Sequence, residues 1–333
     1  MSRDTGQLYV ALRRHLATGE QITAVTLLSR GHSNETYLLE GIDQILRLPP
    51  SGIPLLNGLD MARQFQLYAV LGRLPGGPPV PRVFYYCDDL SVLGAPFYLV
   101  ERVPGVPFDD YTVPDWVARA SDTFRDALSR QYLQAYASLA RLSPLDVLGP
   151  TATPVCECLR WQSLARAAGA RYLVELIDRL IGQPPGESGP PAPVNGDAKM
   201  ANDLWLEGRL QGVLDWELAF NGDPLAELGY MLIFFESDTH GPQPGFDLPG
   251  MWRREQVISE WERISGRSAR GLDWFEAAAA AKITAILAYG HHLATVQQSS
   301  DARMAAWLPF VEQWTEVTSR LVTKAVAGKR VPR

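Results

Sequence analysis

The sequence predicts an α+β protein of two lobes, a small β-rich lobe over residues 1–102 and a larger, mainly helical lobe over residues 103–333. The length favours two lobes, because the chain has 333 residues and a single hydrophobic core stops growing at roughly 250–300 residues. The composition favours large cores, because 46% of the residues are hydrophobic and only 20% are charged. The local pattern changes from short β-type runs to helical spacing after Pro104 and Gly105, which mark the joint.

The first lobe begins with a predicted helix over residues 6–17, where leucines recur at every fourth position. A second helix is expected from about Asp60, a residue type that often caps helices, and it ends before the Gly and Pro residues at 76–79. Five short runs of β-type residues are expected to form one small antiparallel sheet. These runs are residues 22–28, 36–39, 44–48, 81–86 and 97–100.

The second lobe shows apolar residues at helical spacing over most of its length. Helices are predicted over residues 124–141, 159–181, 276–289 and 304–326. Residues 182–193 consist mostly of Gly, Pro and polar residues, which predicts a solvent-exposed loop. Short strands and turns are expected from Val194 to about Pro224, and helices return from Leu225.

Charge and cysteine content exclude several classes of function. Lys and Arg number 31 and Asp and Glu number 37, which gives a net charge of −6 without any dense basic run, so a general nucleic-acid surface is not expected. The three cysteines form neither a disulfide framework nor a metal-ligand spacing, which favours the cytoplasm. No window approaches the roughly 18 apolar residues that span a bilayer, so no membrane association is expected.

Two polar segments stand out in an otherwise apolar chain. Residues 195–202 include Asp197 and Asn202, and residues 213–217 include Asp215. Mg²⁺ prefers oxygen ligands and takes one or two protein groups beside water and substrate phosphate, so an Asp and an Asn side chain suit it. A further Asp that is not bound to metal can orient and deprotonate an attacking hydroxyl. The pattern therefore predicts magnesium and phosphate chemistry.

The same residues carry a family resemblance. Four residues separate Asp197 from Asn202, and twelve separate Asn202 from Asp215. This spacing resembles the catalytic loop and metal-binding Asp of the aminoglycoside phosphotransferase superfamily, whose kinase-like enzymes transfer the γ-phosphoryl group of a nucleotide to a hydroxyl. The runs at 214–217 (LDWE), 222–224 (GDP) and 225–230 (LAELGY) resemble the kinase domain that is fused to some acyl-CoA dehydrogenases. Upstream runs at 33–37, 46–50, 80–83 and 91–102 extend the resemblance over residues 22–235.

The resemblance implies a bilobal protein-kinase-like fold, with nucleotide bound between a nucleotide-binding lobe and a catalytic, substrate-binding lobe. Asp197 would position the substrate hydroxyl and accept its proton, while Asn202 and Asp215 would hold Mg²⁺ against the phosphates of ATP. Lys199 either neutralises the transferred phosphoryl group or is simply exposed to solvent.

The resemblance also implies a set of nucleotide contacts in the first lobe. The turn after the first strand would cover the phosphates, a cation on the third strand would contact them, and the connector between the lobes would bind adenine through its backbone. The corresponding residues are Arg30, Gly31, His32, Ser33, Asn34, Arg47, Glu101 and Val103.

Three positions depart from the family pattern. Asn195 replaces the usual His two places before Asp197, and we expect Asn to replace its hydrogen bonds. Gln64 replaces the Glu that pairs with the third-strand cation, so Arg47 is expected to form a weaker hydrogen bond with it. Ala201 replaces a Gly, which restricts the backbone if φ is positive. A non-catalytic nucleotide-binding protein is therefore kept as an alternative.

The acceptor is expected to be a small molecule with a hydroxyl group. The resemblance favours a hydroxyacyl-CoA or a hydroxy acid, and an aminoglycoside or another antibiotic is the rival. A cationic aminoglycoside calls for an acidic helical lobe. The candidate acids for such a surface are Glu227, Glu236, Asp238 and Asp247. The chain is expected to act as a monomer or homodimer.

Overall fold

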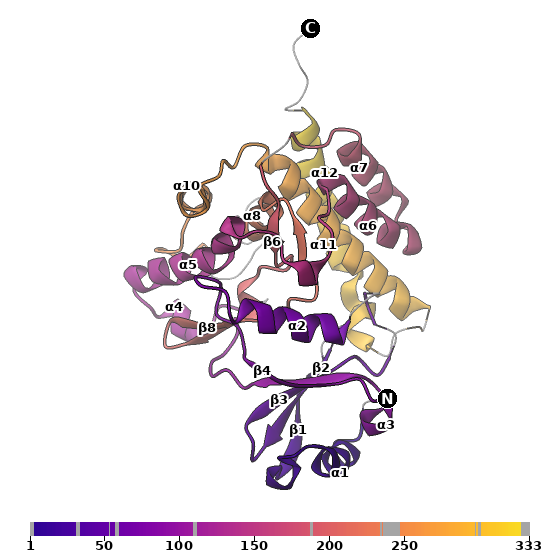
Figure 1. Ribbon diagram of the computed structural model, residues 1–333. Coiled ribbons are helices and arrows are strands. Elements are labelled where there is room, and N and C mark those ends of the chain that lie inside the picture. The colour runs from indigo at the N-terminus through magenta and orange to yellow at the C-terminus, as the bar shows by residue number, and fades with distance from the viewer. Residues whose placement is uncertain are drawn as a thin grey trace.

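The computed structural model describes most of the chain, and Figure 1 shows its course. The described residues are 3–30, 34–52, 54–56, 60–108, 112–186, 189–233, 235, 247–296, 298 and 301–327. A five-stranded antiparallel sheet in the order β1-β2-β3-β5-β4 forms one end of the molecule. Its strands are β1 (Ala24–Arg30), β2 (Glu35–Glu40), β3 (Gln44–Leu48), β4 (Val83–Cys87) and β5 (Phe97–Glu101). The prediction of one small antiparallel sheet is confirmed.

Two helices pack against this sheet. Helix α1 (Thr5–His15) packs against β1 and is capped by the Asp4 side chain, which accepts the backbone N–H groups of the first turn. Its buried leucines join a small apolar core with the inner residues of the sheet. Helix α2 (Met61–Leu71) begins after the cap Asp60, as predicted, and lies between the sheet and the helical part. A short helix, α3 (Leu90–Leu93), connects β4 to β5.

The rest of the chain is mainly helical. Its helices are α4 (Asp115–Ala118), α5 (Asp122–Ala137), α6 (Pro154–Ala167), α7 (Arg171–Ile181), α8 (Leu225–Leu232), α10 (Arg254–Ser265), α11 (Leu272–Thr295) and α12 (Leu308–Ala327). Helix α11 is central, because it contacts α6, α7, α8 and α12. These helices share one large apolar core, which also includes residues of α2 and β5. The core therefore continues from the helical part to one face of the sheet.

The helix predicted over residues 159–181 is wrong in extent. The chain forms two helices there, α6 and α7, because Gly169 adopts a left-handed φ of +70° between them. Tyr172, one of the residues at the predicted helical spacing, is 52% exposed. The predicted loop at 182–193 also ends earlier, because strand β6 begins at Ala192.

The polar segments of the sequence adjoin two small antiparallel pairs of strands. Strand β6 (Ala192–Val194) pairs with β9 (Phe220–Gly222), and β7 (Asp203–Leu206) pairs with β8 (Arg209–Val213). The predicted bilobal α+β fold is confirmed, whereas the division into units at residue 102 stays a prediction. Within the part of the chain that the structure describes, no helix is both long enough and apolar enough to cross a bilayer.

Candidate functional site

The 195–202 loop connects β6 to β7 and has a backbone that its sequence fits closely. Gly196 has a φ of +82°, and a Cβ atom there would lie 2.8 Å from the carbonyl oxygen of Leu218, so glycine is required. Ala201 is not among the described residues with positive φ. The replacement of Gly by Ala at this position therefore does not strain the backbone.

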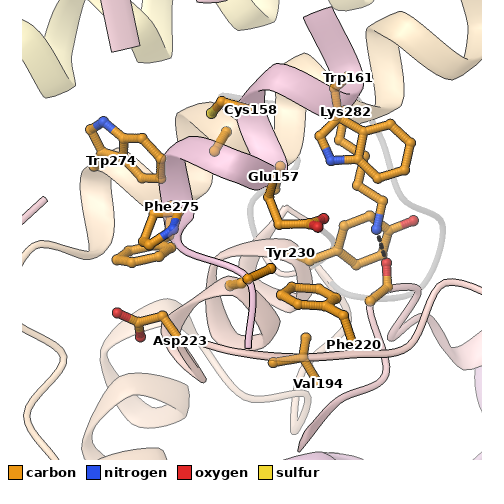
Figure 2. Close-up of a pocket in the computed structure, with 16 residues that line it drawn as sticks. Glu157, Cys158, Trp161, Val194, Phe220, Asp223, Tyr230, Trp274, Phe275 and Lys282 are labelled. Atoms are coloured by element: carbon orange, nitrogen blue, oxygen red, sulfur yellow. Dashed lines mark hydrogen bonds between the residues drawn. The ribbon is translucent and has the colours of Figure 1, made fainter. Parts of the chain in front are cut away.

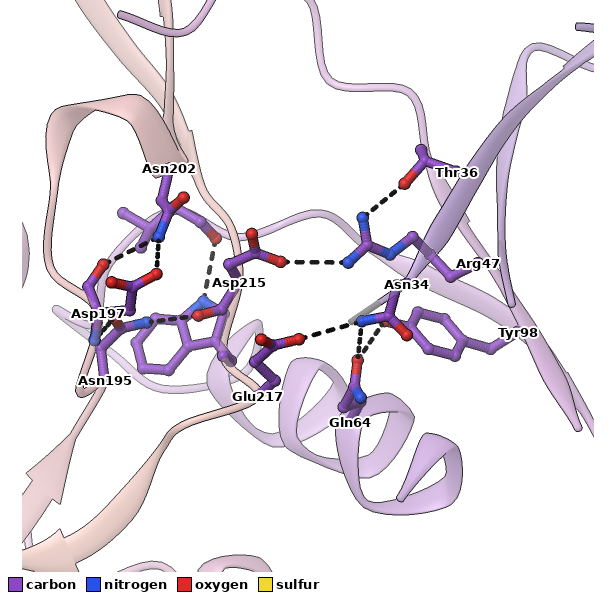
Figure 3. Close-up of polar contacts among 12 residues, drawn as sticks. Asn34, Thr36, Arg47, Gln64, Tyr98, Asn195, Asp197, Asn202, Asp215 and Glu217 are labelled. Carbon is purple, nitrogen blue, oxygen red and sulfur yellow. Dashed lines mark hydrogen bonds and ion pairs between the residues drawn. The ribbon is translucent and has the colours of Figure 1, made fainter. Parts of the chain in front are cut away.

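The Asp197 carboxylate accepts hydrogen bonds on both oxygens, and Figure 3 shows the one from Asn202. The Asn202 Nδ2 group donates to Asp197 Oδ2 at 2.7 Å and to the Asp197 carbonyl at 2.9 Å. The Tyr230 hydroxyl, on α8, donates to Asp197 Oδ1. The side chain of Asp197 is 21% exposed, so it is fixed in orientation and still open to a substrate. Tyr230 belongs to the resemblance at 225–230, but nothing in the local sequence indicated this contact.

Lys199 lies beside this carboxylate. Its Nζ atom is 4.0 Å from Asp197 Oδ2, and its side chain is 27% exposed. The position is compatible with a charge-neutralising role near Asp197, which stays a prediction.

Hydrogen bonds to the backbone hold the segment around Asp215 beside the 195–202 loop. The Leu214 N–H donates to the Asn202 carbonyl at 2.8 Å, and the Asn195 Nδ2 group donates to the Asp215 carbonyl at 3.4 Å. Asp215 has a φ of +52°, an uncommon conformation for a residue other than glycine, and 40% of its side chain is exposed. The structure thus brings Asp197, Asn202 and Asp215 together, as the spacing predicted.

The donor set at Asn202 and Asp215 fits a magnesium ion. Because the Asn202 amide nitrogen is used by Asp197, its carbonyl Oδ1 is the atom left for a cation. The Asp215 carboxylate is partly open to solvent. In the described parts of the chain, no cluster of three or more His, Cys, Asp or Glu side chains is arranged for a metal. Two oxygen donors beside phosphate and water are the set that Mg²⁺ commonly takes.

Asn195 connects the two polar segments. It is fully buried, its Oδ1 accepts the Asp197 backbone N–H at 2.9 Å, and its Nδ2 reaches the Asp215 carbonyl. The expectation that Asn replaces the hydrogen bonds of the usual His therefore agrees with the geometry.

Arg47, on β3, contacts Asp215 directly. Its Nη2 atom lies 3.1 Å from Asp215 Oδ1, and its Nη1 donates to the Thr36 hydroxyl at 2.7 Å. The predicted bond between Arg47 and Gln64 is wrong. Gln64 Oε1 instead accepts from the Tyr98 hydroxyl at 3.1 Å, because the α2 side chain is turned toward β5 (Figure 3).

Asn34 follows the turn for which phosphate contacts were predicted. It is 3% exposed, and its Nδ2 donates at 3.3 Å both to Gln64 Oε1 and to Glu217 Oε2. Its Oδ1 is buried and has no hydrogen-bond partner in the described part of the chain. Arg30 ends β1, but its side chain is not described, and Gly31, His32 and Ser33 lie outside the described residues. The phosphate contacts of this turn stay a prediction.

The connector between the lobes begins at the end of β5. The Glu101 N–H donates to the Arg82 carbonyl at 2.8 Å, and the Glu101 carboxylate accepts the Arg82 N–H at 3.1 Å. The Val103 side chain packs against Gly212 of β8. Glu101 and Val103 are thus fixed at the joint, and their contact with adenine stays a prediction.

Two buried charges support the 195–202 loop from behind. The Glu227 carboxylate, on α8, accepts the backbone N–H groups of Asn195 and of Gly196, the latter at 3.2 Å. Burial raises the pKa of Glu227 to about 7. Lys282, on α11, donates to the Gly196 carbonyl, and burial lowers its pKa. The sequence did not indicate a role for Lys282, which lies far along the chain from this loop.

Comparison with known proteins gives one family match and several relatives that match this chain over part of their own length. The model of the phosphotransferase enzyme family matches residues 24–266. Acyl-CoA dehydrogenase family member 11 of Gallus gallus is 29% identical over 328 residues, which cover 90% of this chain and 41% of that protein. Its Mus musculus counterpart is 30% identical over 252 residues, which cover 70% of this chain and 31% of that protein. The chain spans about a third to two fifths of these relatives.

Solved structures share the fold at low sequence identity. A candidate aminoglycoside phosphotransferase from Ralstonia eutropha has a TM-score of 0.75 at 21% identity and covers 96% of this chain and 98% of its own. A ternary complex of the phosphotransferase APH(4)-Ia with AMP-PNP and hygromycin B has a TM-score of 0.60 at 17% identity, with coverage of 97% and 99%. These similarities show the fold.

Proposed function

Because the chain belongs to the phosphotransferase enzyme family, we propose that it transfers the γ-phosphoryl group of ATP to the hydroxyl group of a small molecule. One observation supports this proposal most strongly. Asp197, Asn202 and Asp215 converge, and Arg47 reaches them from the other lobe. Phosphoryl transfer needs little covalent help from a protein and depends mainly on alignment and charge neutralisation, which this arrangement supplies.

Asp197 is the proposed base. The Asn202 and Tyr230 hydrogen bonds fix the direction of its carboxylate, so an acceptor hydroxyl can be aligned with the phosphoryl group before reaction. Lys199, 4.0 Å away, is proposed to offset negative charge that develops during transfer.

Asn202 and Asp215 are the proposed ligands of Mg²⁺, which would neutralise charge on the β- and γ-phosphates. Arg47 is already paired with Asp215, so it lies where the same guanidinium can contact a nucleotide phosphate. Asn34 lies in the same lobe, at the end of the proposed phosphate-covering turn, whereas Glu101 and Val103 are proposed to bind the adenine edge through their backbone.

For the acceptor we propose a hydroxyacyl-CoA or a related hydroxy acid. This proposal is supported by the relatives that are more similar in sequence than the solved structures are. They are named acyl-CoA dehydrogenase family members, and the chain spans only part of them. The rival is an aminoglycoside, since a structural neighbour was solved with hygromycin B. One acid expected to bind such a cation, Glu227, is buried and bonded to backbone N–H groups, which weakens the rival. Glu236 and Asp238 lie outside the described residues.

The non-catalytic alternative rested on Asn195, Gln64 and Ala201. Asn195 keeps hydrogen bonds to both polar segments, and Ala201 needs no positive φ. Gln64 does not pair with Arg47, but Arg47 pairs with Asp215 without it. These contacts favour a catalytic protein.

The proposal is tested by incubating the protein with ATP and Mg²⁺ and a panel of hydroxy acids, their coenzyme A thioesters and aminoglycosides. ADP release and the mass of a phosphorylated product are measured, with Asp197→Asn as the inactive control. We expect product from a hydroxyacyl acceptor. Product from an aminoglycoside alone would overturn the acceptor, and nucleotide binding without product from any acceptor would favour the non-catalytic alternative.

A further inference from the structure

A pocket of about 50 Å³ borders Gly196 of the 195–202 loop, and Figure 2 shows side chains that line it. Its walls come from α6, α8, α11 and the β6 and β9 strands, and most of its lining is apolar. The aromatic lining residues are Trp161, Phe220, Tyr230, Trp274 and Phe275. Such a lining suits an apolar chain.

One end of this pocket holds the buried ammonium group of Lys282. The side chain is 8% exposed, donates to the Gly196 carbonyl, and lies 5.2 Å from the ring centre of Trp161 and 4.9 Å from that of Tyr230. No carboxylate among the described residues lies within 4.0 Å of it. An ammonium group has three N–H donors, and a buried charge is costly unless oxygen acceptors surround it. The geometry therefore calls for a further acceptor oxygen at this end.

Two carboxylates also line the pocket, and one of them, Glu157, favours the charged form of Lys282. Glu157 lies 4.0 Å from Arg160. Asp223 accepts the backbone N–H of Leu225 at 3.0 Å, and burial raises its pKa. With one cation and two acids, the lining does not select a strongly charged ligand. It suits a largely neutral chain that places one oxygen atom at Lys282.

The Lys282 end of the pocket adjoins the proposed base. Gly196, which accepts from Lys282, directly precedes Asp197, and Tyr230 contributes its ring to the pocket and its hydroxyl to Asp197. A ligand oxygen bound at Lys282 would thus lie one residue from Asp197 along the loop.

We propose that this pocket binds the acyl part of the acceptor, an apolar chain whose carbonyl or carboxylate oxygen accepts a hydrogen bond from Lys282. The inference rests on the proposed function and names Lys282 as the residue that selects the acceptor. The oxygen belongs either to a free hydroxy acid or to a hydroxyacyl thioester, which share this chemistry. A polycation is disfavoured at the Lys282 end, because it would meet a buried like charge.

The kinetic test compares wild type with Lys282→Met on hydroxy acids, their coenzyme A thioesters and matching alcohols that lack the acyl oxygen. We expect Lys282→Met to lower kcat/KM at least about tenfold for the acyl acceptor and by less than about twofold for the alcohols. The acid and thioester series show which source supplies the oxygen. Lys324→Met is the matched control, because Lys324 is 58% exposed and paired with Asp273, and it should change neither value.

A binding measurement keeps the test independent of turnover and of folding. Acids and acyl thioesters without a hydroxyl are titrated while tryptophan fluorescence is followed, since Trp161 lines the pocket. We expect saturable binding to wild type and Lys324→Met, and binding at least about tenfold weaker to Lys282→Met, whose thermal melting confirms a folded chain.

The outcomes separate this inference from the proposed function. The role of Lys282 would be overturned if wild type and Lys282→Met bound the acyl compounds equally and if Lys282→Met lost the same kcat/KM for acyl acceptors and for alcohols. Any phosphorylated product would still leave the proposed function standing. Lys282-dependent binding of acyl compounds without phosphoryl transfer to any acceptor would support the pocket and overturn the proposed function.

Discussion

The 195–202 loop and the contact between Arg47 and Asp215 are two halves of one site that are held in different ways. The loop residue Asn195 is fully buried, and its side chain accepts the Asp197 backbone N–H. Glu227, on α8, is 3% exposed and accepts the Gly196 backbone N–H. Across the lobes, Arg47 and Asp215 are 19% and 40% exposed and meet through one contact of 3.1 Å. The loop is rigid support, whereas the contact between the lobes can exchange partners.

The energies differ accordingly. Removing one partner of a buried hydrogen bond costs about 1–3 kcal/mol, whereas in a partly buried ion pair the desolvation cost offsets much of the Coulomb attraction. Arg47 can therefore leave Asp215 for a phosphate at little cost, and Asp215 can turn to a cation. The comparison indicates that the proposed acceptor side is organised in advance, and it predicts that the proposed nucleotide side is completed by its ligand.

The largest expected effect comes from the rigid half. Asp197→Asn should lower kcat by about 10²–10⁴-fold, the usual contribution of a general base, while nucleotide affinity stays unchanged. Steady-state kinetics and nucleotide titration measure the two quantities. Asp146→Asn, at an exposed position, is the matched control and should have no effect. Equal activity of Asp197→Asn and wild type would remove Asp197 from the chemistry.

A smaller effect is expected from the exchangeable half. Arg47→Met should raise KM for ATP about tenfold, or about 1.4 kcal/mol, and change kcat much less, because the guanidinium would contact phosphate mainly in binding. Arg119→Met, which removes an exposed arginine paired with Asp115, should leave KM unchanged. An unchanged KM for Arg47→Met would contradict the exchange of partners.

The smallest effect concerns stability and pH. Burial raises the pKa of Glu227 from an ordinary 4.5 to about 7, so the folded chain binds more protons than the unfolded chain between these values. The Glu227 contribution to the free energy of unfolding should therefore fall as pH rises through this range, with a slope of up to about 1.4 kcal/mol per pH unit, and level off above it.

This pH dependence is measured by urea denaturation, as the difference in the free energy of unfolding between wild type and Glu227→Gln. The difference should decline from about pH 4.5 to about pH 7 and then stay constant. The exposed Glu255→Gln variant should show no such trend. A flat difference for Glu227→Gln would mean that the carboxylate keeps its charge throughout.

The sequence predicted the β-rich lobe well because its strands are short, alternate with turns and pair mostly with neighbours along the chain. It failed at Gly169, where apolar residues continue at helical spacing on both sides of a left-handed turn. The spacing of apolar residues indicates which face of a helix is buried, but it does not indicate where one helix ends and the next begins in another direction.

For the site, the sequence predicted the residues that share one motif. Asp197, Asn202 and Asp215 lie within a short stretch, so their spacing and family resemblance placed them together. The contacts of Gln64 and Lys282 depend on tertiary packing and could not be inferred in the same way. A lone lysine on the alanine-rich helix α11 was the available signal, since an apolar helix rarely carries a buried charge without a partner.

The most direct test of the account is the binding of Mn²⁺ with ATP, followed by electron paramagnetic resonance, in wild type, Asp215→Asn and Asp197→Asn. The account predicts that Asp215→Asn loses bound Mn²⁺, whereas Asp197→Asn retains it and only fails to transfer the phosphoryl group. Retention of Mn²⁺ by Asp215→Asn, or its loss in Asp197→Asn, would contradict the assignment of metal and acceptor to opposite sides of the site.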